Sequence, residues 1–243
     1  MEFTYQAYRE MLKLLRDTGY ELRGYRDYET AVRPAVLRHD IDTSLSQAVQ
    51  LAELEAEEGV RSTYFVLLRT DFYNPASREG LAALRRIQSL GHEIGLHFDE
   101  ASYVPALTPV QTVQNIIKEC RLLSALLETY VSSVSMHRPS RATLEADLHI
   151  PGIVNSYGKT FFQDFKYLSD SRRRWREPVL DIIRSGSYAR LHILTHAFWY
   201  HEDDWDISQT VGAFVRSANR ERWRQMAENI TDMDAILKEE EVQ

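Results

Sequence analysis

Histidine and aspartate side chains gather at four points of the sequence, each at the end of a short apolar run. The four segments are Arg38-His39-Asp40-Ile41-Asp42, His97-Phe98-Asp99-Glu100, His137-Arg138-Pro139 and Thr195-His196. Imidazoles and carboxylates bind zinc and similar transition metals, and they are also the usual proton donors and acceptors of enzymes. The pattern therefore indicates metal binding combined with acid–base chemistry.

The first segment contains two carboxylates whose spacing in the sequence places them on the same side of an extended chain. Asp40 and Asp42 are two residues apart, so both side chains face the same way in an extended chain. Two such carboxylates repel each other unless a cation or a shared proton lies between them. A divalent metal would relieve the repulsion, with one aspartate as ligand and the other as general base for metal-bound water. The alternative for Asp42 is a helix cap, because Thr43 and Ser44 follow it.

Two histidines are further candidates for chemistry. His97 ends an apolar run, and its occurrence together with the aspartate pair favours a metal ligand over a half-buried structural histidine. His196 lies among apolar residues and aromatics, which suits a general acid whose pKa is tuned by its surroundings. Four other histidines are interpreted as structural or solvated: His92, His149, His192 and His201.

These side chains need elements that bring them together, and the sequence predicts alternating strands and helices. Strands are expected at residues 35–38, 62–68, 92–98, 131–137, 152–157 and 190–199. Helices are expected at residues 4–17, 44–58, 76–90, 109–128, 178–184 and about 208–238. Such alternation implies a parallel sheet covered by helices, either open or closed into a barrel. Chemistry then belongs at the carboxyl ends of the strands, in a single domain covering residues 1–243.

Composition excludes several classes of protein. The chain has 243 residues, of which 44% are hydrophobic and 27% are charged. These ordinary values argue against collagen, coiled-coil rods and intrinsic disorder for the chain as a whole. The formal net charge of −7 disfavours a nucleic-acid partner held through its phosphates, and it disfavours docking on anionic lipid.

Cysteine content and the apolar segments limit the redox chemistry and the location. Cys120 is the only cysteine, which excludes an internal disulfide and a multi-cysteine zinc site; its apolar neighbours indicate a small core residue. Charges at Glu2, Arg9 and Glu10 leave no secretory apolar region, and no apolar run reaches the roughly 18 residues of a membrane span. We therefore expect a cytoplasmic location and no membrane span.

Five segments, taken in order, resemble a known family. They are LRHDID (37–42), STYFVLL (62–68), GHEIGLH (91–97), HRPS (137–140) and LTHAFW (194–199). The set resembles the polysaccharide deacetylase superfamily, the NodB-homology group related to carbohydrate esterase family 4. Within it, the chain resembles divergent cytoplasmic members found with O-antigen and other surface-polysaccharide genes. The resemblance covers about residues 30–200 and implies a distorted, incomplete (β/α) barrel.

The resemblance also implies an activity, a cofactor and roles for individual residues. The activity is metal-dependent removal of an N- or O-acyl group from a sugar, with zinc favoured over cobalt, nickel or iron. Asp40 aligns with the base and Asp42 best supplies the metal ligand. Because Ile41 separates a pair that is usually adjacent, the two roles could be reversed. Arg138 matches the arginine that orients the base, and His196 matches the general acid.

One departure from the family pattern concerns the metal ligands. The family carries two metal-binding histidines four residues apart. His97 matches the first, but Ala101 stands in the place of the second. His137, at the end of the next strand, is the favoured replacement; an oxygen from Asp99 or Glu100 is the alternative, and a poorly binding, inactive site is a third.

Residues for substrate binding are expected on the segment 169–177 and after the last strand. Asp170 and Trp175 resemble a family motif that orients the general-acid histidine and shapes the pocket. Arg173 could hold a pyrophosphate, and Trp175 and Trp199 could stack on sugar rings, the alternatives being a solvated loop and buried aromatics. The expected substrate is an acylated sugar or a nucleotide- or lipid-linked sugar precursor.

Three other readings remain open at this point. The same metal site could hydrolyse a non-sugar amide. Ala101 suggests a catalytically inactive binding module with a deacetylase fold. The helix at 208–238 could join copies of the chain into a homo-oligomer instead of covering the barrel.

Overall fold

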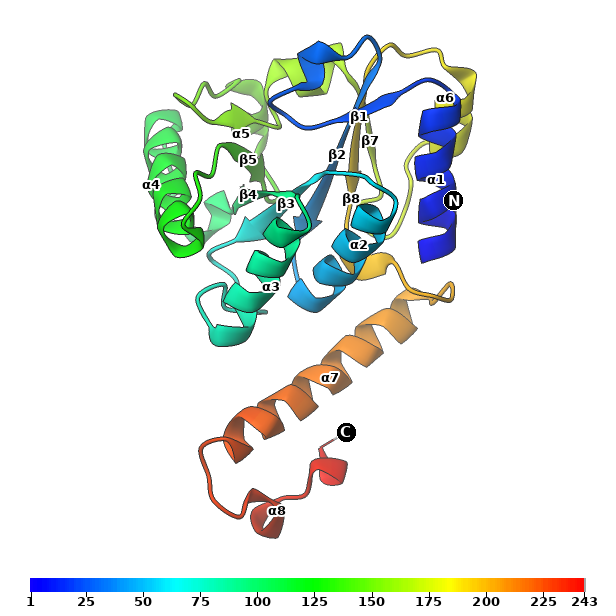
Figure 1. Cartoon of the computed structure of the whole chain (residues 1–243). Coiled ribbons are helices and arrows are strands. Elements are labelled where there is room, and N and C mark those ends of the chain that lie inside the picture. Colours follow the sequence, from blue (N-terminus) through cyan, green and yellow to red (C-terminus); the bar gives the residue numbers. More distant parts are fainter. Residues whose placement is uncertain (243) are drawn as a thin grey trace. The chain divides into compact units, whose positions relative to one another are not determined.

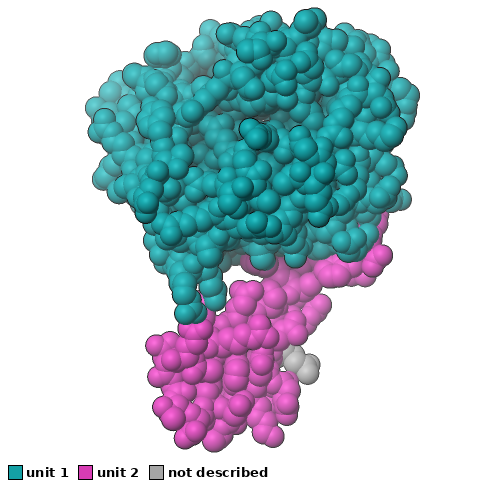
Figure 2. All heavy atoms as spheres, viewed as in Figure 1, with its two compact units in different colours: residues 1–202 teal, residues 203–243 magenta. Residues whose placement is uncertain are grey.

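The computed structural model describes residues 1–242, which form two compact units. Residues 1–202 make up unit 1, and the chain from Asp203 onward makes up unit 2 (Figure 2). All the strands of the described chain and all the predicted site residues belong to unit 1. The expectation of a single domain over residues 1–243 stays a prediction.

Unit 1 is built on an eight-stranded sheet in which every pairing is parallel (Figure 1). The strands are β1 (Glu21–Arg23), β2 (Pro34–Ile41), β3 (Thr63–Leu67), β4 (Glu93–Phe98), β5 (Ser133–Met136), β6 (Val154–Asn155), β7 (Lys166–Ser169) and β8 (Leu191–Thr195). Their order is β6-β5-β4-β3-β2-β8-β7, with β1 paired to the first half of β2. Within the described residues this path ends at β6 and β7, so the predicted incomplete (β/α) barrel is confirmed.

Helices follow most of the strands and lie around the sheet (Figure 1). In unit 1 they are α1 (Tyr5–Asp17), α2 (Leu45–Glu57), α3 (Arg78–Ser89), α4 (Pro109–Leu127), α5 (Arg141–Glu145) and α6 (Val179–Ser185). The four longest of these helices begin at hydroxyl caps. In α4, Thr108 and Gln111 form a reciprocal capping box, with Pro109 at the first helical position between them. Cys120 of α4 is buried, and burial raises the pKa of its thiol to about 12. It is the core residue that was predicted.

Side chains of β2 alternate between the two faces of the sheet. Leu37 and Ile41 join the large core beneath the helices, whereas Val36 joins a second cluster inside the barrel. That inner cluster consists of Tyr25, Val36, Phe65, Phe161 and Phe165. Because the strand has a period of two, Arg38, Asp40 and Asp42 follow Val36 on the inner face. The residues expected to take part in catalysis thus line the inside of the barrel, next to this largely aromatic inner cluster.

The opening between β6 and β7 is bridged by side chains. Tyr157, which follows β6, stacks on Phe162 with ring centroids 4.8 Å apart. Phe162 in turn stacks on Tyr167 of β7 at 4.5 Å. Three aromatic rings therefore stand where a further strand would close the barrel.

Unit 2 consists of α7 (Ile207–Ala227), the short α8 (Met233–Ile236) and the residues that follow them. Asp206 and Gln209 form a capping box at the start of α7. The indole of Trp223 donates a hydrogen bond to the Leu237 carbonyl, which holds the segment after α8 against α7. The helix expected at 208–238 is thus interrupted after Ala227. None of the described helices is long and apolar enough to cross a membrane.

Candidate active site

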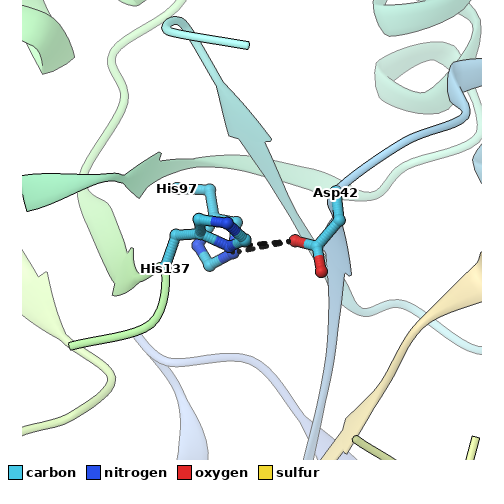
Figure 3. Close-up of side chains that lie close together, drawn as sticks. All are labelled: Asp42, His97 and His137. Carbon is cyan, nitrogen blue, oxygen red and sulfur yellow. Dashed lines mark hydrogen bonds and ion pairs between the residues drawn. The ribbon is translucent and has the colours of Figure 1, made fainter. Parts of the chain in front are cut away.

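Three side chains from three strands converge at the carboxyl edge of the sheet. Asp42 follows β2, His97 lies near the end of β4, and His137 follows β5. The Oδ1 atom of Asp42 lies 3.2 Å from His97 Nε2 and 3.3 Å from His137 Nδ1. The two imidazole nitrogens are themselves 3.2 Å apart. Figure 3 shows both rings directed at the Asp42 carboxylate.

This triangle of donor atoms fits a metal ion. Ligands held at about 2.0–2.1 Å in a tetrahedral site are separated by about 3.3 Å from each other. Asp42 Oδ1 is also buried and has no hydrogen-bond partner within residues 1–242, so its lone pairs are free for a cation. Burial alone would raise the pKa of Asp42, but the imidazoles of His137, His97 and His196 outweigh it and hold that pKa far below its usual range. One carboxylate and two imidazoles suit zinc and similar transition metals.

The strand register explains how His137 takes the place left by Ala101. His97 of β4 is the register partner of Ser135 in β5, so His137, two residues further on, projects from the same face. The Nδ1 atom of His97 lies 3.4 Å from the Ser135 carbonyl oxygen, which favours the tautomer that leaves Nε2 free for the metal.

The two acidic residues after β4 serve to hold loops. Asp99 accepts hydrogen bonds from the Ala101 amide and the Ser102 hydroxyl, and Glu100 accepts from Ser140 and Thr143. The structure thus brings His137 into contact with Asp42 and engages Asp99 and Glu100 elsewhere.

Asp40 lies beside the triangle and has different partners. Its Oδ2 atom accepts a hydrogen bond from Arg38 Nη2 at 3.0 Å. Ser135 Oγ donates to the same carboxylate at 3.3–3.4 Å. The same Oδ2 is 3.7 Å from His97 Nε2. Asp40 is only 4% exposed, so this carboxylate faces the triangle from a sheltered position.

The arginine expected to orient Asp40 is a different one in the structure. Arg138 has a left-handed backbone, with φ of 47°, and its side chain is 72% exposed and lies 3.5 Å from Asp99. The guanidinium that contacts Asp40 belongs to Arg38, which is fully buried inside the barrel. Sequence reasoning missed Arg38, although the alternation of β2 already places it on the same face as Asp40.

His196 also lies close to the triangle and is held by Asp170. The His196 Nδ1 atom lies 2.6 Å from Asp170 Oδ1, and the His196 amide donates to Oδ2 of the same carboxylate. The Nε2 atom of His196 is 3.8 Å from Asp42 Oδ2. Burial lowers the pKa of His196, but the charges of Asp170, Asp42 and Asp40 outweigh it and raise the pKa to about 9. This imidazole is therefore protonated at neutral pH and can donate a proton.

The predicted substrate-binding side chains lie on segments that follow β7 and β8. The Arg173 guanidinium lies 4.8 Å from the centre of the Phe3 ring. Trp175 and Trp199 are partly buried against the main core, and the indole N–H of Trp175 is buried with no hydrogen-bond partner in the described chain. Their roles in binding stay predictions.

A second buried polar cluster lies on the opposite face of the sheet, beneath α1 and α2; we call it the outer-face cluster. Its centre is Glu55 of α2, which accepts hydrogen bonds from Tyr8, Ser62 and Tyr64 and lies 3.0 Å from His39 Nε2. The other nitrogen of His39 is 2.6 Å from the Thr195 hydroxyl. The cluster therefore ties together the residues next to Asp40 and His196. Sequence reasoning missed it, because Glu55 reads as an ordinary helix residue.

Comparison with known proteins yields similar structures only. No protein-family model matches the chain, and neither does any curated protein. Deacetylase PplD from Streptococcus pyogenes, solved with acetate, is 14% identical with a TM-score of 0.46, over 58% of this chain and 66% of that one. A CE4 family pseudoenzyme from Bacillus anthracis is 14% identical with a TM-score of 0.45, over 79% and 64%. Peptidoglycan deacetylase PdaC from Bacillus subtilis is 11% identical with a TM-score of 0.44, over 82% and 98%. The chain thus spans just under two thirds of the first two structures.

Proposed function

We propose that the protein is a metal-dependent hydrolase that removes an N- or O-acyl group from a sugar or a sugar-containing precursor. The observation that carries this proposal is the set of three metal-fitting atoms of Asp42, His97 and His137, with Asp40 and His196 both within 4 Å of a member of the set. The resemblance of the sequence to polysaccharide deacetylases supports the choice of an acyl group on a sugar.

Asp42, His97 and His137 would hold a divalent ion, zinc first among the candidates. When bound, such an ion polarises the acyl carbonyl and lowers the pKa of water. Asp40 accepts the proton of the water molecule whose oxygen adds to the carbonyl carbon. His196, protonated at neutral pH, gives its proton to the departing amine or alkoxide. The bond between the acyl carbon and that nitrogen or oxygen then breaks, which yields a carboxylic acid and the free amino sugar or alcohol.

The division of labour between Asp40 and His196 follows from their neighbours. Asp40 is hydrogen-bonded to a fixed cation, Arg38, which orients its carboxylate as the proposed proton acceptor. His196 is paired with the buried Asp170, which favours the protonated imidazole. A carboxylate that accepts a proton and an imidazole that donates one are the pair of groups that acid–base catalysis needs.

We further propose that the substrate is a small acylated sugar, free or linked to a nucleotide or lipid, and that the protein acts in the cytoplasm. Arg173 is proposed to bind its phosphate, and Trp175 and Trp199 its sugar ring. The sequence features that support this substrate are the arginine-rich segment and the tryptophans.

Metal titration of the purified protein is the first test. We expect one zinc equivalent bound by the wild type, with affinity at least about tenfold lower in His97→Ala and His137→Ala. His149→Ala is the matched control, because His149 is an exposed histidine outside the site. A wild type that binds no zinc, or histidine variants that bind as well as the control, would contradict the proposed metal site.

The activity is tested separately by the release of acetate from N-acetylglucosamine oligomers and from UDP-N-acetylglucosamine. Asp40→Asn should lower kcat by about 10²–10⁴-fold, the usual contribution of a general base, while zinc affinity persists. Release from non-sugar amides alone would replace the sugar substrate with the alternative amide. Zinc binding without any hydrolysis would favour the binding module.

A further inference from the structure

The two aspartates of the site are two residues apart on one strand, yet their surroundings differ. Asp42 Oδ1 faces two imidazole nitrogens and has no hydrogen-bond donor within the described residues. Asp40 Oδ2 is bound by the Arg38 guanidinium at 3.0 Å and by the Ser135 hydroxyl at 3.3 Å. One carboxylate is therefore free for a metal ion, whereas the other is already occupied by donors.

The distances of the two carboxylates from His97 do not explain why one would bind the metal and the other would not. Asp40 Oδ2 is 3.7 Å from His97 Nε2, only slightly further than the 3.2 Å between that nitrogen and Asp42 Oδ1. A carboxylate so close to a bound cation is strongly attracted to it. Some fixed group must hold Asp40 back if it is to remain a base.

The contacts of the Arg38 side chain make it that fixed group. Its side chain is fully buried, and Nη1 donates to Ser156 at 2.6 Å while Nη2 also donates to Tyr157 at 3.2 Å. The guanidinium lies 4.8 Å from the Tyr157 ring centre and 5.7 Å from that of Phe65. Held on several sides, it cannot follow Asp40 toward the metal without breaking these contacts.

We propose that Arg38 is a positioning residue that keeps Asp40 out of the metal's ligand set and thereby decides which aspartate is the ligand and which is the base. The inference rests on the proposed function, since it presupposes a metal at Asp42, His97 and His137. It assigns to a residue of β2 itself the task for which the sequence resemblance indicated Arg138.

Removal of the Arg38 charge should therefore change the metal site. Arg38→Met leaves a buried carboxylate without its cation, and the metal becomes its nearest source of positive charge. Asp40 then becomes an additional ligand, which tightens metal binding and withdraws the base from catalysis. Activity should fall while metal affinity rises, a combination that simple structural damage does not produce.

The test is cobalt and zinc titration with the visible absorption of the cobalt protein as a second readout. For Arg38→Met we expect metal affinity about tenfold or more above wild type, the usual size of effects around a metal's ligands, together with an altered cobalt spectrum. Arg38→Met combined with Asp40→Asn should return affinity and spectrum to the wild-type values. Arg38→Lys, which keeps the charge but not the planar guanidinium, should lie between wild type and Arg38→Met in metal affinity and spectrum. Arg138→Met, the matched control, should stay near wild type in both.

Two results would overturn the inference: an Arg38→Met protein with unchanged affinity and spectrum, or a gain in affinity that persists when Asp40 is also replaced. Arg38→Gln, which keeps hydrogen-bond donors toward Ser156, provides the same comparison should Arg38→Met not fold. Failure of the proposed function is seen earlier, in a wild type that binds no metal. Wild-type binding combined with unaltered Arg38 variants overturns the role of Arg38 alone.

Discussion

Replacement of Glu55 by alanine should be among the most damaging single changes in unit 1, although Glu55 lies on the face of the sheet opposite the site. Its carboxylate is fully buried and accepts hydrogen bonds from three hydroxyl groups, those of Tyr8, Ser62 and Tyr64. It also lies 3.0 Å from the His39 imidazole. Burial alone would raise the pKa of Glu55, but His39, His92 and the Ser62 hydroxyl outweigh it and lower the pKa to about 2.

The expected loss of stability follows from the buried hydrogen-bond donors that have no acceptor in the Glu55→Ala variant. Each buried donor without an acceptor costs about 1–3 kcal/mol. The Ser62 hydroxyl can still donate to His92 Nδ1, 3.2 Å away. Two stranded hydroxyls, those of Tyr8 and Tyr64, and one stranded imidazole nitrogen therefore set a lower value of about 3 kcal/mol, within the 3–5 kcal/mol typical of breaking a buried ion pair. That is a large part of the roughly 5–15 kcal/mol by which domains are stable. Tyr64→Phe removes one donor and leaves Glu55 its others, so it should cost only about 1 kcal/mol.

Urea unfolding followed by tryptophan fluorescence and circular dichroism measures these differences. Glu57→Ala is the matched control, because Glu57 lies on the same helix, is 67% exposed and pairs with Arg9 on the surface. Its replacement should change stability by no more than about 0.5 kcal/mol. The reasoning is refuted if Glu55→Ala is no more destabilising than Glu57→Ala. If Glu55→Ala does not fold, Glu55→Gln should fall between Tyr64→Phe and the alanine variant.

Two further predictions concern pH and packing. Burial lowers the pKa of both His92 and His192 below 6.5 in the folded protein, so the unfolded chain binds more protons below that pH. The stability that these two neutral imidazoles give should therefore be complete above pH 6.5 and fall as the pH drops through it, with a second loss between about 4.5 and 2 from Glu55. His196, whose pKa is raised from 6.5 to about 9, acts in the opposite sense, so its contribution is lost as the pH rises through that range. A urea midpoint that is constant from pH 8 to pH 3 would contradict this. Gly95→Ala would place a Cβ atom in steric clash with the Phe65 ring and 2.6 Å from Ser133 Oγ. The substitution should lower the free energy of unfolding by at least about 1–3 kcal/mol, measured by thermal or urea unfolding. An unchanged stability would show that the neighbouring side chains can rearrange to accept the added methyl group.

The sequence predicted the parts of the site that depend on strand periodicity. Spacing of two residues placed Asp40 and Asp42 on one face, and the position of His97 and His196 at strand ends brought them to the same edge. His137 was predicted as a replacement for Ala101, and the register of β4 with β5 supplies the physical reason. Alternation of β and α segments likewise predicted the parallel, incomplete barrel.

Other features depend on contacts that no local pattern reveals. The direction of the Arg138 side chain, toward Asp99, was not foreseen, so its contact with Asp40 was predicted wrongly and Arg38 was overlooked. The strands β1 and β7 were missed because segments of three and four residues carry too little periodicity. The long helix predicted at 208–238 ends earlier, at Ala227.

The origin of the three metal-fitting side chains on separate strands has a consequence for the lifetime of the fold. Even the two histidines are 40 residues apart in the chain, so an unfolded chain would have to close a long loop before two ligands could meet. A pair of histidines four residues apart would retain some affinity for zinc in the unfolded chain. These three ligands, far apart in the sequence, would retain almost none. Nearly all of the binding free energy would then favour the native state, about 2.7 kcal/mol when free zinc stands at a hundred times its dissociation constant. The ion would cross-link β2, β4 and β5. A shortage of metal would therefore make the chain more susceptible to proteolysis and also abolish its activity.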